Sequence, residues 1–190
     1  MTTKPQNEES LDHSGAHGAE PSGSTVVFTD ITEAPLEPLY AAAKAEVMTD
    51  AMGALVIFDG IVRNHDHGSA VRGLSYSAHP QAREYIAEVA AEVAAELDGV
   101  RLWAVHRVGP IAIGESALTV MAAAAHRGRA FDACELVADR VKARVPIWKE
   151  QELLDGSIEW VGVDTSPAYP SEYSEYKPVR GISLGQAYSP

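Results

Sequence analysis

Lysine and arginine side chains gather in one stretch of this chain, from Arg127 to Lys149, although the protein as a whole is acidic. Six of its 15 basic residues fall in this stretch, while the formal net charge of the 190-residue chain is −12. A basic cluster in an acidic protein indicates a localised site for an anion. A nucleic-acid partner is not expected, because binding a phosphate backbone needs an extended basic surface.

Lys142 is the first candidate for chemistry within this cluster. Apolar residues recur at helical spacing over 128–145, and Lys142 falls about 20° from Phe131, at the edge of the apolar stripe. A lysine there either extends its ammonium to water, paired with Asp139, or is partly desolvated. Desolvation disfavours the charged ammonium and makes the amine a better base or nucleophile. Position alone leaves both interpretations open.

Lys149 lies on the first strand of a predicted hairpin. The runs IWKEQEL and SIEWVGV flank Asp155-Gly156, which is a strong signal for a two-residue turn. With that turn, Lys149 lies opposite Gly162, where a missing side chain would leave room beside the amine. The alternative is an ordinary strand lysine that faces solvent.

His126 and Arg127 stand where a predicted strand leads into the helix over 128–145. Free N–H groups and a partial positive charge at a helix N-terminus favour phosphate or carboxylate there, whereas the alternative is a solvated loop. Arg63 opens a polar loop after an apolar strand, a place where site residues are often found. The string RNHDH that it begins lacks a convincing third ligand, so we expect no metal. Cys134 is the only cysteine and is expected to be a buried thiol.

One folded domain is expected over 25–164, between two polar tails. Residues 1–24 carry too little apolar surface to offset chain entropy, so we expect disorder there. Residues 165–190 predict an extended tail rich in Pro and Tyr. Neither a secretory signal nor a run of roughly 18–20 apolar residues is present, so we expect a cytoplasmic protein without a membrane span.

Helices alternate with pairs of strands along the domain, in the order βαββαββαββ. That order predicts an α+β fold with about three helices and a mixed, largely antiparallel sheet. The chain contains neither GxGxxG nor a P-loop, which argues against nucleotide-binding folds. Strands are predicted over 25–31, 53–62, 74–78, 100–108 and 116–125 and in the hairpin, helices over 35–47, 80–98 and 128–145, and a polar loop over 63–73.

Four strings in this sequence occur together in a family-specific order and spacing. They are GALVIFDGIVRNHDHG (53–68), VHRVG (105–109), AHRGRAF (125–131) and KARVPIWKE (142–150). With these strings the chain resembles the MoaE family, the large, catalytic subunits of molybdopterin synthase, over about 26–163. Ser77 departs from the acid found in many relatives, and Gly128 and Arg129 depart from small hydroxyl residues.

The resemblance implies an α/β hammerhead-type fold and a dimer of catalytic subunits. It also implies a small ubiquitin-like sulfur-carrier subunit at each end, which gives a heterotetramer. The C-terminal Gly-Gly thiocarboxylate of the carrier would enter a pocket and give its sulfur to cyclic pyranopterin monophosphate. Two such transfers build the dithiolene of molybdopterin, without a cofactor or a metal.

By motif position, Lys142 and Lys149 look like the family's two active-site lysines. The pockets of the family are completed across the dimer interface, which implies that His126 and Arg127 serve the neighbouring subunit. The residues implied in substrate binding are Arg63, His126, Arg127, Glu150 and Gln151.

Two other functions fit the same basic residues. A non-catalytic adaptor would bind the Gly-Gly tail of a carrier and process nothing. A Schiff-base enzyme would use Lys142 as a nucleophile toward a carbonyl substrate.

Overall fold

The computed structural model describes residues 23–66, 69–153 and 156–161. The tails predicted over 1–24 and 165–190 lie outside this part of the chain, apart from Gly23 and Ser24. Within it, no helix is long and apolar enough to cross a membrane.

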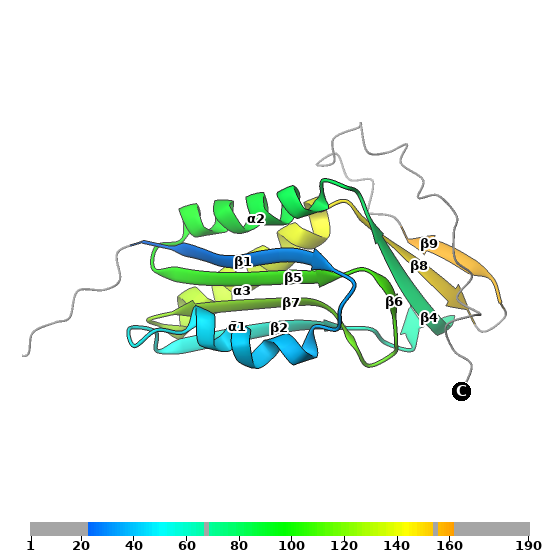
Figure 1. The fold of residues 1–190 in the computed structure, drawn as a ribbon, viewed down its shortest axis with the longest axis horizontal. Coiled ribbons are helices and arrows are strands. Elements are labelled where there is room, and N and C mark those ends of the chain that lie inside the picture. Colours follow the sequence, from blue (N-terminus) through cyan, green and yellow to red (C-terminus); the bar gives the residue numbers. More distant parts are fainter. Residues whose placement is uncertain (1–22, 67–68, 154–155, 162–190) are drawn as a thin grey trace, which may run out of the picture.

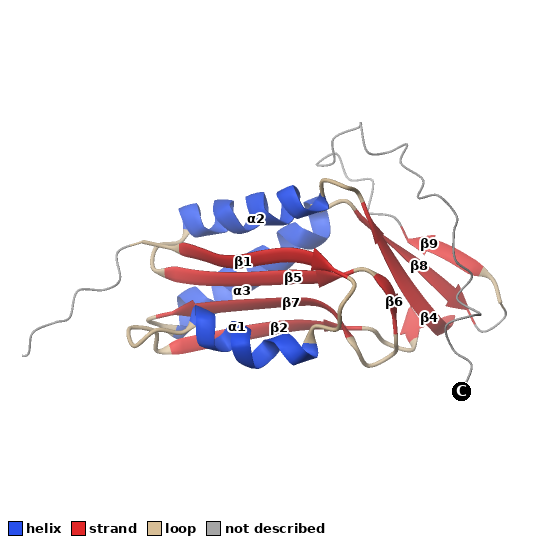
Figure 2. Cartoon of the chain, in the orientation of Figure 1, coloured by secondary structure: helices blue, strands red, loops and turns tan. Residues whose placement is uncertain are grey.

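The first sheet has four strands in the order β1-β5-β7-β2 (Figures 1 and 2). Only β1 and β5 run parallel, while β7 is antiparallel to both of its neighbours. The strand β2 is therefore an outer strand, paired on one side only. The bounds are β1 (Thr25–Thr32), β2 (Ala54–Ile61), β5 (Val100–Arg107) and β7 (Ser116–Ala124).

Helices cover both faces of this sheet. Because side chains alternate along a strand, Leu102 and Val120 pack with α2 (Ala82–Glu96) and α3 (Arg127–Arg144). Trp103 and Met121 point the other way, into a cluster with residues of α1 (Tyr40–Val47) and of the segment before it, which holds the 3₁₀ turn η1 (Glu37–Leu39). All positions of β7 are buried as a result, which explains why its sequence is apolar except for Ser116 and Thr119.

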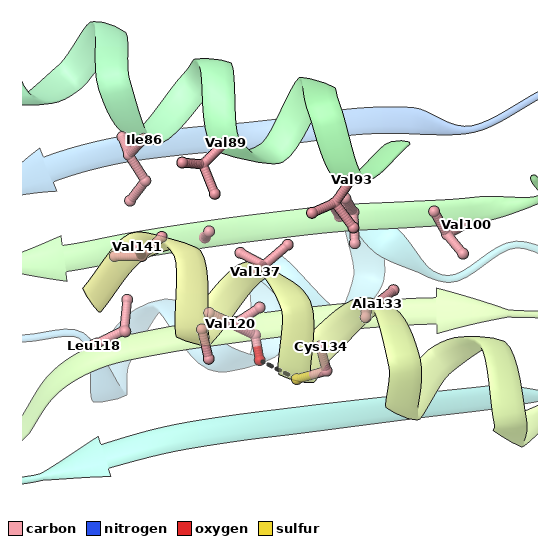
Figure 3. Packing of buried hydrophobic residues seen from close by; sticks show 14 of the residues in the cluster. Ile86, Val89, Val93, Val100, Leu118, Val120, Ala133, Cys134, Val137 and Val141 are labelled. Atoms are coloured by element: carbon pink, nitrogen blue, oxygen red, sulfur yellow. Dashed lines mark hydrogen bonds between the residues drawn. The ribbon is translucent and has the colours of Figure 1, made fainter. Parts of the chain in front are cut away.

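The larger core cluster lies between the sheet and α2 and α3, where valines and alanines from both helices interdigitate (Figure 3). Cys134 belongs to it, and its Sγ donates to the carbonyl oxygen of Val120 at 3.7 Å. Burial raises the pKa of the Cys134 thiol to about 11. The prediction of a buried, unreactive thiol is confirmed.

A second sheet stands at the end of the first sheet toward which β2 runs (Figure 1). The long strand β4 is antiparallel to β8 on one side and to β6 on the other. The loop predicted over 63–73 is wrong at His65 and Asp66, which form β3, and again from residue 69 onward, because β4 begins at Ser69 and buries Val71 there. The bounds are β3 (His65–Asp66), β4 (Ser69–Ala78), β6 (Gly109–Ile111), β8 (Ile147–Leu153) and β9 (Ile158–Val161).

The predicted hairpin exists, but its turn is one residue longer than expected. The N–H of Leu153 donates to the carbonyl of Ser157 at 2.9 Å, and Gly156 adopts φ 82°, as in three-residue hairpin loops that end on a left-handed glycine. The register moves by one, so Lys149 pairs with Val161. The predicted pairing with Gly162 is therefore wrong.

The fold class is confirmed as α+β, with three α-helices and mostly antiparallel pairing within the described residues. The two sheets meet in a small apolar group, which we call the joint cluster. It consists of Val62, Leu74, Ile111 and Ala117, with the ring of Tyr76 packed against it.

His106 is buried at the end of β5, where its ring meets that of Tyr76 edge to face at a centroid distance of 5.0 Å. Its Nδ1–H donates to the carbonyl oxygen of Arg107 at 2.7 Å. Burial is the main cause that lowers the pKa of His106, from its usual 6.5 to about 4, so the imidazole is neutral near pH 7.

The free energy of unfolding should therefore decrease as the pH is lowered from about 6.5 to about 4. The unfolded state binds a proton at His106 in this range and the folded state does not, so acid favours unfolding. From pH 7 to pH 5 we expect a loss of about 2 kcal/mol in chemical denaturation. A His106→Asn variant should lose this part of the pH dependence; a wild-type curve that stays flat between pH 7 and pH 5 would contradict the buried neutral imidazole.

Candidate active site

Arg63 is positioned by the end of the outer strand β2. The backbone just before it is fixed, because the N–H of Val62 donates to the carbonyl of Glu115 at 2.9 Å and the N–H of Gly114 donates to the carbonyl of Val62 at 2.8 Å. The side chain of Val62 enters the joint cluster. Arg63 itself is exposed, beside the joint between the two sheets.

Lys149 reaches the same joint from the second sheet. It lies on β8 directly opposite Tyr76, whose ring packs on the joint cluster. Side chains opposite each other in a sheet share a face, and Gln151, two residues further on, shares it as well. Gln151 is only 2% exposed, whereas Glu150 lies on the other face, opposite Ser75. Of the two predicted substrate-binding residues on this strand, only Gln151 therefore shares the face of Lys149.

Lys142 lies near the end of α3, shortly before the chain enters β8. It is exposed, so in the single chain the interpretation of an ammonium that extends to water fits and that of a partly desolvated amine does not. The prediction took Phe131 as part of the buried stripe, but Phe131 is 59% exposed. The face that α3 buries is rotated away from both residues and consists of Ala130, Ala133, Cys134, Val137, Ala138 and Val141.

His126 and Arg127 lie at the opposite end of the molecule from the joint. The strand β7 ends at Ala124, opposite the first residue of β2, and α3 starts immediately afterwards. Fifteen residues of α3 separate Arg127 from Lys142, which at 1.5 Å per residue is about 22 Å. The structure thus places Arg63, Lys142 and Lys149 toward the end of the first sheet that meets the second sheet. His126 and Arg127 lie at the opposite end of the first sheet.

The start of α3 is open to an anion. His126 is the N-cap residue and is exposed, and its side chain does not cap the helix. The first turn contains no acidic residue that would offset the positive end of the helix. Arg127, Gly128 and Arg129 are exposed as well, so the first N–H groups of α3 can be approached from solvent.

Two other cations of the basic stretch, Arg140 and Arg144, form ion pairs with glutamates of the neighbouring helix. Arg140 donates to both carboxylate oxygens of Glu96, at 2.7 and 2.6 Å. Arg144 likewise donates to both oxygens of Glu92. Both glutamates belong to α2, and these hydrogen bonds lower the pKa of each carboxyl. The basic stretch from Arg127 to Lys149 is therefore not one anion site, because these two arginines join α3 to α2.

The outer edge of the first sheet carries exposed apolar side chains. On β2, Ile57, Phe58 and Ile61 are 44%, 42% and 47% exposed. Phe131 lies nearby on α3, which packs against β2. We call these four residues the β2 edge; they are exposed apolar side chains on, or on the helix beside, a strand whose outer side pairs with no other strand of the described chain.

The string RNHDH, at which we expect no metal, extends from Arg63 to His67, and His67 lies outside the described residues. Elsewhere in the described chain, no three His, Cys, Asp or Glu side chains are grouped so that they could hold a metal. Tyr76 lies opposite Lys149, and the sequence pattern does not single it out, because a tyrosine in a strand is ordinary. Its position becomes informative only once the pairing of β4 with β8 is known.

Similarity to known proteins agrees with the motifs. A family model described as "MoaE protein" matches residues 31–144. A molybdopterin synthase catalytic subunit from Aspergillus clavatus is 36% identical over 135 residues, covering 70% of this chain and 67% of that protein. Molybdopterin synthase catalytic subunit 1 from Mycobacterium tuberculosis is 34% identical over 148 residues, covering 77% and 95%. The crystal structure of molybdopterin synthase from Staphylococcus aureus has a TM-score of 0.65 at 30% identity, covering 70% of this chain and 95% of that chain. This chain belongs to the MoaE family.

Proposed function

We propose that this chain is the catalytic subunit of a molybdopterin synthase. It would transfer sulfur from the C-terminal thiocarboxylate of a small carrier subunit to cyclic pyranopterin monophosphate. The observation that supports this proposal is the placement of two cations beside the joint of a MoaE-family fold: Arg63 directly follows Val62 of the joint cluster, and Lys149 lies opposite Tyr76, which packs on it. Lys142 lies near the end of α3, five residues before β8 begins. We propose that these three cations bind the two anionic reactants.

The chemistry assigns a different task to each group of cations. Arg63 and Arg127 hold the phosphate of the pterin, because a guanidinium binds a phosphate with two parallel hydrogen bonds. The N-terminus of α3 adds its own N–H groups to this phosphate site. Lys142 and Lys149 stabilise the thiocarboxylate and the oxyanion that forms when its carbonyl carbon is attacked. Either amine can also move a proton when water leaves the pterin side chain.

A complete site under this proposal needs two copies of the chain. A phosphate cannot contact Arg63 and Arg127 of the same chain, because the length of α3 separates the two ends. If two copies pair along the β2 edge about a twofold axis, their α3 helices run antiparallel, and Arg127 of one lies beside Lys142 of the other. That pairing would also cover the exposed apolar side chains of the β2 edge.

The carrier would approach the joint from the side of the second sheet. A Gly-Gly terminus is slender and ends in a negative charge, so it suits a narrow entry lined by lysines. The relatives are named catalytic subunits, which fits an enzyme with at least one further subunit. We propose that the dimer binds one such carrier at each end.

Replacing Lys142 with Ala should nearly abolish product formation and leave the fold intact. Lys142 is exposed on the single chain, so its loss creates no cavity, while the oxyanion loses a cation. We expect kcat to fall by about 100-fold or more, measured as molybdopterin formed from thiocarboxylated carrier. Lys44→Ala, an exposed lysine on α1, is the matched control and should act like wild type. Near-normal turnover by Lys142→Ala would refute the role assigned to Lys142. If the wild type and all variants bind the carrier but form no product, the non-catalytic adaptor is favoured instead.

Mixing two inactive variants should restore activity if the site spans two copies. In a heterodimer of Lys142→Ala with Arg127→Ala, one site holds both substitutions and the other holds none. Random exchange of subunits should therefore return about a quarter of the wild-type activity. A site within one chain would give no recovery, because every site would carry one of the two substitutions. Subunit exchange is followed by native mass spectrometry in the same samples.

A further inference from the structure

Tyr76 stands between two strands that present very different neighbours. It lies near the end of β4, opposite Lys149 of β8 on one side and opposite Gly109 of β6 on the other. Cross-strand partners have Cβ atoms about 4.5–5.5 Å apart and project from the same face. The aromatic ring and the stem of Lys149 are therefore side by side on the face toward the joint cluster.

The ring of Tyr76 is fixed by groups that are themselves buried. His106 meets it edge to face, with an interplanar angle of 82°, and His106 is only 8% exposed. The hydrogen bond from His106 to the carbonyl of Arg107 sets the orientation of the imidazole. Gly109 offers no side chain that could compete for this space, and the joint cluster packs against the ring as well.

We propose that Tyr76 is a positioning residue of the active site, whose ring is held by His106 and in turn holds the side chain of Lys149. This inference rests on the proposed function of Lys149. The flexible four-carbon side chain of a lysine has many rotamers. A fixed aromatic ring beside this side chain excludes most of them. Because the ring also packs against the joint cluster, to which Val62 belongs, it links Lys149 to the part of the fold that carries Arg63.

The proposal makes the aromatic ring necessary and the phenol hydroxyl dispensable. Tyr76→Phe should keep kcat within about twofold of wild type, whereas Tyr76→Leu should lower kcat by roughly 10- to 100-fold. The KM for cyclic pyranopterin monophosphate should change little in both variants, because the phosphate is held by arginines. Tyr85→Leu is the matched control. Tyr85 is a half-buried tyrosine on α2 that packs against the larger core cluster, away from the joint cluster.

A second readout follows Lys149 directly and needs no turnover. The rate at which an amine-reactive acylating reagent labels Lys149 is measured by mass spectrometry, with the exposed Lys44 as an internal standard. In Tyr76→Leu the label on Lys149 should appear several-fold faster relative to Lys44, and in Tyr76→Phe at the wild-type rate. Equal labelling of Lys149 in wild type and Tyr76→Leu would overturn the proposal.

The outcomes separate this inference from the proposed function. If Lys149→Ala turns over normally, the role of Lys149 itself is wrong. If Lys149→Ala is inactive and Tyr76→Leu is fully active, only the positioning role is wrong. If Tyr76→Phe is as slow as Tyr76→Leu, the hydroxyl is what counts and the proposal fails. Should Tyr76→Leu not fold, His106→Gln loosens the support of the ring and keeps Tyr76; faster labelling of Lys149 there supports the proposal, and unchanged labelling overturns it.

Discussion

Helix α3 is a rigid rod, and its length sets what a single chain can do. The rod is held straight along the sheet by its buried alanines and valines and by the bidentate pairs of Arg140 and Arg144 with α2. Arg127 and Lys142 are thereby kept about 22 Å apart, further than a phosphorylated pterin can bridge. One chain alone therefore cannot bring both residues to the same substrate molecule. In a pair of copies with antiparallel α3 helices, Arg127 of one copy would lie beside Lys142 of the other.

The joint between the sheets is the second fixed point. Four apolar side chains there connect the end of β2 to β4, β6 and β7, so the backbone before Arg63 and the strand opposite Lys149 cannot move independently. The cations around the joint cluster are accessible to solvent, whereas the groups that hold them in place are buried. His106 belongs to the second kind, since burial keeps its ring neutral and its edge against Tyr76.

The parts of this arrangement that depend on local patterns could be predicted from sequence. The buried run of β7, the apolar spacing of α2 and α3, and the turn signal at Gly156 all led to the right elements. The phase of α3 was not predictable in the same way, because Phe131 is apolar yet lies on an exposed flank. The first half of β4, from Ser69 to Gly73, was missed because its serine, arginine and glycine are also typical of a loop. The register of Lys149 depended on one extra residue in a turn. The role of Tyr76 arises from pairing between strands that are distant in sequence, which no local pattern reveals.

We expect Arg127 of one copy and Lys142 of another to lie at one site. A cross-linking experiment tests this with a cysteine at each position in separate chains, Arg127→Cys and Lys142→Cys, and with Cys134→Ala in both to remove the native thiol. A short bifunctional maleimide should join the mixed chains into a covalent dimer, and should join neither variant to itself, because copies of the same position lie at opposite ends of the pair. A dimer in solution that gives no cross-link in the mixture, or the same cross-link within each variant alone, would contradict the account.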